Sequence, residues 1–278
     1  LSGTFAMFKK MIEEGVEPSS HTFGIMMGLC ANRGDVTHVR DLLNLAQQHN
    51  VQITAPMIDT VVEAYCNNSE WEMAEHVAET CLGLDVKGSR VRMWNILLWN
   101  YAFRMDLEAI SRIRSRMDAA GLEPDDMTYS ALMLSLVLIG QTDSARRILR
   151  ALHRGRRVYA TEFHYAVILY GYLKDRNRDM VHIIFREIKD RFNQPGLGSR
   201  LLVLKSQIQR DLQLLAQGGQ VGNHANIRLE NSEKFLAETL ADYHSTKLAT
   251  KYPLLGSGRM SARKGFPAVY YEYMISAY

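Results

Sequence analysis

The chain has 278 residues, of which 47% are hydrophobic and 23% charged, and its formal net charge is +3. This composition is ordinary for a folded protein and excludes a polycationic or low-complexity chain. The longest apolar run, Ala131–Ile139, is too short to cross a bilayer. Cys30, Cys66 and Cys81 show no metal or redox spacing, so we expect reduced core cysteines in an intracellular compartment.

Apolar markers recur every 35 or 36 residues along most of the chain. The first opens each predicted first helix, at Phe23, Ile58, Trp94, Tyr129 and Tyr165. The second lies late in each second helix, at Met11, Ala46, Cys81, Met117, Leu152 and Ile188. The third is a terminating proline, at Pro18, Pro124 and Pro195. Because three markers keep one register, the sequence predicts helical hairpins that bury their apolar faces only by stacking on neighbours.

In chain order, residues 1–19 are predicted to be the second half of a repeat. Five repeats follow, at 20–54, 55–90, 91–125, 126–161 and 162–196. The clearest, 91–125, has a first-helix face of Trp94, Leu97, Leu98 and Tyr101 and a second-helix face of Ile110, Ile113 and Met117. Carboxylates near the turns inside the hairpins are expected to cap second helices, at Asp35, Asp106 and Asp143.

Residues 197–267 depart from this period. We expect one enlarged or two degenerate helical hairpins there, with flexible loops and helical segments at Leu201–Leu215 and Glu233–Ala249. Residues 268–278 are predicted to be the first helix of a further repeat. The array is therefore expected to continue beyond this sequence, and any targeting segment to lie outside it.

The repeat resembles the pentatricopeptide repeat. Trp94–Leu98 (WNILL) is similar to that family's Tyr-Asn-Thr-Leu-Ile opening, and Phe8–Met11 (FKKM) and Phe185–Ile188 (FREI) are similar to its Phe-x-x-Met ending. Gly15–Ser19 and Gly121–Asp125 resemble its Gly-Ile-x-Pro-Asp close. The resemblance covers residues 1–196. The competing tetratricopeptide repeat has 34 residues and an early Trp-x-x-Leu-Gly signature, which this sequence lacks.

The resemblance implies an all-α fold, an α-solenoid of stacked helical hairpins wound into a right-handed superhelix. It also implies binding of single-stranded RNA, with about one base read per repeat. In such a repeat a polar first-helix residue reaches the base edge, the last residue of the repeat orients it, and the second residue packs on base faces. The fold contains no predicted cofactor or metal site.

These three places map onto the sequence repeat by repeat. The base-reading place falls on Gly24, Asp59, Asn95, Ser130 and Ala166. The orienting last residues are Thr54, Arg90, Asp125, Thr161 and Gly196. The face-packing residues are His21, Pro56, Arg92, Met127 and Phe163. Only Asn95 with Asp125 matches a well-known pair of the family, and that pair implies uracil; Asp59 and Arg90 are expected to pair with each other.

A basic run crosses the fourth repeat. Its arginines are candidates for a phosphate-tracking surface, at Arg146, Arg147, Arg150, Arg154, Arg156 and Arg157. The alternative is a solvated outer face, because first helices line the concave side of the family's solenoids. Both interpretations stay open from the sequence alone.

No nucleotide-binding, metalloprotease or paired-cysteine motif is present, so we do not predict an enzyme. The leading interpretation is an RNA-binding P-type array in organelle gene expression. The resemblance, which is greater to fungal than to plant members, implies a mitochondrial location and support of the stability, processing or translation of a mitochondrial messenger. The alternative is a protein-interaction scaffold, either mitoribosome-associated or an assembly factor, that uses the same concave surface.

Overall fold

A computed structural model describes residues 2–84, 86–155, 157–217, 229–246 and 266–278. These residues contain fourteen α-helices and no β-strand, arranged as successive antiparallel hairpins, so the predicted α-solenoid fold class is confirmed. The chain divides into two compact units, which we call the N-terminal unit (Leu1–Ser135) and the C-terminal unit (Leu136–Tyr278). Helix α8 (Asp126–Leu138) contributes residues to both units.

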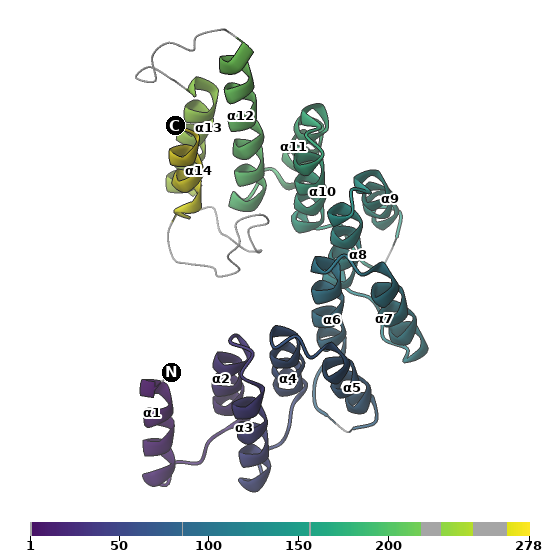
Figure 1. Ribbon diagram of the computed structural model, residues 1–278, viewed down its shortest axis with the longest axis vertical. Coiled ribbons are helices and arrows are strands. Elements are labelled where there is room, and N and C mark those ends of the chain that lie inside the picture. The colour runs from purple at the N-terminus through teal and green to yellow at the C-terminus, as the bar shows by residue number, and fades with distance from the viewer. Residues whose placement is uncertain (1, 85, 156, 218–228, 247–265) are drawn as a thin grey trace. The chain divides into compact units, whose positions relative to one another are not determined.

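The N-terminal unit is a stack of hairpins. Its helices are α1 (Ser2–Glu13), α2 (Ser20–Ala31), α3 (Val36–Gln48), α4 (Ala55–Asn67), α5 (Trp71–Leu82), α6 (Val91–Phe103) and α7 (Leu107–Ala119). Helix α2 packs on α3, α4 on α5 and α6 on α7. The first helices α2, α4 and α6 also pack against one another in sequence (Figure 1). Each first helix is therefore enclosed by its own partner and by its neighbours.

This enclosure explains why the first helices are apolar on nearly all sides. In α6 the predicted face is confirmed, because Trp94, Leu97 and Leu98 are fully buried and Tyr101 is 4% exposed. The second helices bury one stripe only. In α7 the predicted stripe is also confirmed, since Ile110, Ile113 and Met117 are all buried. Cys30, Cys66 and Cys81 are buried free thiols in this core, and burial raises the pKa of Cys66 to about 12.

The second helices begin at polar caps in a fixed phase. The cap positions are Asp35, Glu70, Asp106, Gln141 and Asn177, in steps of 35 or 36 residues. The Asp35 carboxylate accepts from the backbone N–H of His38, and the Asp106 carboxylate accepts from that of Ala109. The prediction for Asp143 was wrong. It lies two residues past the cap Gln141, and its carboxylate accepts from the Tyr172 hydroxyl instead.

Each of these hairpin turns contains one residue with left-handed backbone geometry. The residues are Gly34, Ser69, Met105, Gly140 and Arg176, with φ between 54° and 83°. The residue that follows donates its N–H to a carbonyl five positions earlier, as in the bond from Asp106 to Tyr101 (3.1 Å). This geometry is the usual end of an α-helix, and glycine adopts it without steric cost. Three of the five turns nevertheless use other residues.

The C-terminal unit continues the same alternation and then lengthens. Its helices are α9 (Thr142–Leu152), α10 (Glu162–Lys174), α11 (Arg178–Phe192), α12 (Leu197–Gln217), α13 (Glu230–Thr246) and α14 (Val269–Ala277). Helix α12 packs against α10 as a first helix does, and α13 and α14 both pack against α12 (Figure 1). The described part of 197–267 is thus one long hairpin, and the final residues of the predicted helix Glu233–Ala249 lie outside the described residues.

A buried carboxylate joins the two helices of this long hairpin. Asp211 of α12 is 4% exposed. It accepts hydrogen bonds from the side chain of Asn231 and from both the backbone N–H and the hydroxyl of Ser232 at the start of α13. Burial opposes ionisation, but these bonds and one from Gln207 outweigh it and lower the pKa of Asp211. The carboxylate therefore caps α13 from a neighbouring helix.

We expect Met105→Gly to stabilise the protein. Met105 has a φ of 58° and is 56% exposed, so glycine removes backbone strain and sacrifices little packing. The expected gain is about 0.5 to 1 kcal/mol in the free energy of unfolding, measured by thermal or urea denaturation. Gly140→Met places the reverse change at an equivalent turn and should destabilise by a similar amount. No gain for Met105→Gly would mean that the methionine side chain contributes more than the backbone costs.

Candidate functional site

The five base-reading candidates all lie in the second turn of a first helix. Asp59, Asn95 and Ser130 are 2%, 5% and 1% exposed, Ala166 is 6% exposed, and Gly24 is half-buried. Because α2, α4 and α6 pack side by side, the candidates of the first three repeats form one row in the N-terminal unit. Buried polar side chains normally have hydrogen-bond partners, so the partners of the polar members of this row must be identified.

The structure brings Asn95 and Asp125 into direct contact. The Asn95 side-chain nitrogen donates to the Asp125 carboxylate (2.9 Å), and the Asn95 oxygen accepts from the Thr128 hydroxyl (2.7 Å). The same Asp125 oxygen accepts from the Thr128 backbone N–H (2.8 Å) and so caps α8. These bonds fix the orientation of the amide. They leave one N–H and one oxygen lone pair of Asn95 unused, which together suit a base edge that offers both a donor and an acceptor.

Thr128 is the member of this set that sequence reasoning missed. It is fully buried, and it belongs to the first turn of α8, which begins the next repeat. Its signal in the sequence is a hydroxyl 33 residues after Asn95, at the third position of a helix that an aspartate caps. The set therefore extends across the boundary between two repeats.

The predicted pair of Asp59 with Arg90 was wrong. The Arg90 guanidinium donates to the backbone carbonyls of Leu82 (3.2 Å) and Leu84 (2.6 Å). The partner of Asp59 is Arg92, whose Nε lies 3.4 Å from Oδ2. The other carboxylate oxygen, Oδ1, is buried and has no hydrogen-bond partner. Burial raises the pKa of Asp59 to about 6, although Arg92 acts in the opposite direction.

The remaining reading candidates make local contacts. The Ser130 hydroxyl donates to the Asp126 carbonyl (2.8 Å). In the C-terminal unit, Thr161 forms a capping box with the buried His164. The Gly196 N–H donates to the Glu162 carboxylate (2.7 Å), which also binds the Ser199 hydroxyl. Thr54 precedes α4 and makes no side-chain cap. These contacts end or connect helices, and none resembles the Asn95 arrangement.

The face-packing candidates differ in exposure. His21 and Pro56 are exposed, and the Arg92 side chain is 72% exposed. Met127 is half-buried. Phe163 is only 2% exposed, so its packing on a base stays a prediction that requires its neighbours to move. It is part of the apolar interior of α10, where first helices are enclosed on most sides.

The arginines of the basic run differ in how exposed they are. Arg146 is predicted as a phosphate ligand, but its guanidinium is held by Glu187 (2.8 Å) and its side chain is only 16% exposed. Arg147 donates to Ser144, and Arg150, Arg154 and Arg157 are exposed. Arg156 lies outside the described residues.

Ion pairs between second helices follow the repeat. Arg146 of α9 pairs with Glu187 of α11, and Arg116 of α7 pairs with Glu75 of α5 (2.7 Å). Both pairs join residues 41 positions apart, which is one repeat plus about one and a half helical turns. Arg112 also binds Glu75. Some arginines of the second helices thus form ion pairs with neighbouring repeats.

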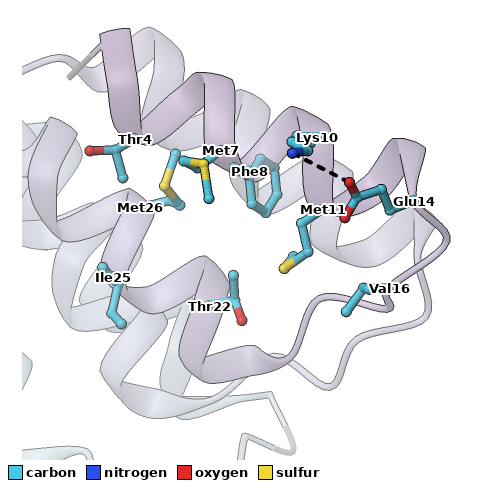
Figure 2. A pocket seen from close by; sticks show the side chains of 10 residues that line it. All are labelled: Thr4, Met7, Phe8, Lys10, Met11, Glu14, Val16, Thr22, Ile25 and Met26. Carbon is cyan, nitrogen blue, oxygen red and sulfur yellow. Dashed lines mark ion pairs between the residues drawn. The ribbon is translucent and has the colours of Figure 1, made fainter.

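An apolar groove lies between α1 and α2 of the N-terminal unit. Figure 2 shows Met7, Phe8 and Met11 of α1 facing Ile25 and Met26 of α2 across it. The groove has a volume of ≈ 450 Å³. Met7 is 67% exposed, whereas the residues at its place in other repeats are buried (Leu42, Ile113 and Ile184) or half-buried (Val77 and Ile148). The groove therefore has the character of a surface on which a first helix packs.

Within the described residues, no group of three or more His, Cys, Asp or Glu side chains is arranged to hold a metal ion. None of the helices in this part of the chain is long and apolar enough to span a membrane.

The fold and this row of polar groups define a class of protein, an α-solenoid of hairpins about 35 residues long with polar residues at matching places on its first helices. A family model described as the pentacotripeptide-repeat region of PRORP matches residues 1–169. The chain belongs to the pentatricopeptide repeat family.

Curated relatives are longer than this chain. The pentatricopeptide repeat-containing protein At3g20730 of Arabidopsis thaliana is 23% identical over 180 residues, which cover 63% of this chain and 31% of the relative. The chloroplastic protein At1g08070 of the same plant is 21% identical over 165 residues, which cover 59% and 22%. The mitochondrial protein At1g53600 is 19% identical over 166 residues, which cover 58% and 22%.

Solved structures show the same kind of similarity. The crystal structure of the pentatricopeptide repeat protein PPR10 in complex with an 18-nt psaJ RNA element aligns with a TM-score of 0.49 and 14% identity. The alignment covers 87% of this chain and 43% of that chain.

We expect Asp59→Asn to stabilise the protein at pH 7.5. The pKa of Asp59 is raised in the folded state, so the ionised carboxylate destabilises the fold above about pH 6 and this cost disappears as the pH falls toward 4. The expected gain at pH 7.5 is about 2 kcal/mol in the free energy of unfolding, and it should shrink at pH 4.5. Urea denaturation at both pH values measures it. Glu63→Gln, which removes a carboxylate one turn away on α4, is the matched control, and an equal gain there would contradict this account.

Proposed function

We propose that this protein binds single-stranded RNA along the row formed by the N-terminal turns of its first helices. The observation that carries the proposal is the contact of Asn95 with Asp125 and Thr128. It holds a nearly buried amide in one orientation with a donor and an acceptor still unused. Uracil presents an N–H between two carbonyl oxygens, so its edge is complementary to such an amide.

The surroundings of this amide support base recognition. Arg92, three residues earlier on the same helix, has a 72% exposed side chain, and guanidinium planes stack on the faces of unpaired bases. His21 and Pro56 hold the equivalent places on α2 and α4 and are exposed. Flat or compact side chains therefore accompany the row, where they can separate successive bases.

We further propose that the protein acts in organelle gene expression. Family membership supports this role, as do relatives whose names place them in the chloroplast and in the mitochondrion. The finer proposal is a mitochondrial protein that supports the stability, processing or translation of a messenger RNA. Two exposed arginines, Arg150 of α9 and Arg154 just after it, are available to a phosphate backbone, whereas Arg146 is held by Glu187.

A protein-interaction scaffold is the second candidate function. The apolar groove between α1 and α2 favours it, because exposed Met7 and Ile25 line a surface of the kind that binds a helix of another protein. Such a scaffold binds its partner without any preference among RNA sequences. The two functions are therefore separated by a measurement of RNA binding.

We expect the protein to bind single-stranded RNA more tightly than a duplex of the same sequence, with a preference of roughly tenfold for an oligonucleotide that contains uracil over one in which cytosine replaces it. Asn95→Ala should remove that preference, because it removes both free amide groups. Fluorescence anisotropy at several salt concentrations measures the affinities, and on single strands the logarithm of affinity falls by about 0.7 per phosphate contact for each decade of salt.

Asn100→Ala is the matched control for this variant. Asn100 lies on the same helix, and its side chain donates to the Ile96 carbonyl (2.8 Å) rather than toward the row. It should leave the uracil preference unchanged. Equal binding of single strand and duplex, with a salt dependence only, would contradict base reading and leave the scaffold as the leading function.

A further inference from the structure

The Asp59 carboxylate is the least satisfied polar group of the row. It is 2% exposed, its Oδ1 atom has no hydrogen-bond partner, and its Oδ2 atom has one long contact of 3.4 Å with Arg92. Asp211 shows what a structural carboxylate looks like in the same chain. With 4% exposure, it uses both oxygens to accept four hydrogen bonds and caps a helix. Asp59 has no comparable structural task.

The chemistry of an ionised carboxylate narrows the bases that it can bind. A carboxylate accepts hydrogen bonds and donates none. Of the four RNA bases, guanine alone carries two adjacent donors on its Watson–Crick edge, N1–H and the N2 amino group. Adenine and cytosine place a ring acceptor beside their amino group, and uracil places carbonyl oxygens on both sides of its N–H, so each would meet the carboxylate with an acceptor.

Arg92 adds a second feature that suits this base. It reaches Asp59 through Nε, while its side chain remains 72% exposed. The contact joins α4 to α6 and therefore links the second repeat to the third. A guanidinium held there can stack on a base face, and displacing it from Asp59 opens the carboxylate to the base edge.

We infer that the second repeat binds guanine, with the Asp59 carboxylate accepting from N1–H and the N2 amino group and the Arg92 guanidinium stacked on the base. This inference rests on the proposed function, because it assigns one base to one place in the RNA-binding row. The second and third repeats are then predicted to bind two adjacent nucleotides of one strand, a guanine and the uracil bound by Asn95.

The ionisation of Asp59 gives this site a dependence on pH. Its pKa is raised to about 6 by burial, with opposing influence from Arg92 on α6 and supporting influence from Glu63 on α4 itself. The Cys81 thiol of α5 also interacts with it electrostatically. Above pH 7 the carboxylate is mostly ionised and accepts from guanine, whereas at pH 5 it is mostly protonated and carries a donor of its own. The Asn95 amide does not ionise in this range.

The test uses short single-stranded RNAs that hold one uracil fixed and vary the nucleotide on either side among the four bases. Fluorescence anisotropy at pH 7.5 should show a preference of roughly tenfold for guanine on one side of the uracil. Asp59→Asn should abolish that preference and keep the uracil preference. This variant is expected to remain folded, since it removes a destabilising charge. Glu63→Gln, the charge-matched control, should keep both preferences, and a shift to pH 5 should weaken only the guanine preference.

The outcomes separate this inference from the function on which it rests. A uracil preference without any preference for a neighbouring guanine would overturn the inference and leave RNA reading in place. A guanine preference that survives in Asp59→Asn would assign it to another residue and also overturn the inference. Weaker binding of all sequences by Asp59→Asn would mean that Asp59 supports the fold instead of reading a base, and would also overturn the inference. Absence of single-strand binding in the unaltered protein would overturn both proposals.

Discussion

The packing of each first helix against the first helix of the next repeat is the constraint on which the rest of the structure depends. It occurs between α2, α4 and α6 in the N-terminal unit and between α10 and α12 in the C-terminal unit. Apolar side chains such as Trp94 and Phe23 are completely buried by it. Because so little of a first helix remains accessible, a polar residue there either finds internal partners, as Asn95 does, or stays unsatisfied at a cost of about 1 to 3 kcal/mol, as Asp59 does.

The second helices are connected by charge rather than by apolar surface alone. Glu75 receives Arg112 and Arg116 from the following repeat, and Glu187 receives Arg146 from the preceding one. Ion pairs with this degree of exposure contribute less than about 1 kcal/mol each. Their larger effect is on geometry, because they fix how far one second helix lies from the next. Arginines that resemble a nucleic-acid surface in the sequence are thereby partly occupied within the protein.

The sequence predicted what depends on periodicity and missed what depends on side-chain orientation. Markers such as Trp94 and Met117 located the hairpins, since burial selects apolar residues at each repeat. Asp143 failed as a cap because it lies out of phase with the caps at Asp106 and Asn177, a phase that the sequence already contained. The left-handed turns at Ser69, Met105 and Arg176 gave no signal, because no glycine marks them.

Contacts across helices were beyond prediction for a different reason. Whether Asp59 meets Arg90 or Arg92 depends on where two long side chains point, because both arginines stand at the start of α6. Phe163 likewise occupies the expected position on its helix, yet its neighbours cover it. Repeat alignment assigns a residue to a place, and packing decides whether that place is open to solvent.

The contact of Asn95 with Thr128 has a consequence for the evolution of such repeat proteins. Asn95 and Asp125 belong to one repeat, whereas Thr128 belongs to the next, and Asp59 meets Arg92 across a boundary in the same manner. Exchange of a whole hairpin by recombination would preserve the first pair and replace the third member. The base specificity of a repeat therefore depends on the repeat that follows it. New specificities are then assembled from adjoining pairs of hairpins rather than from single ones.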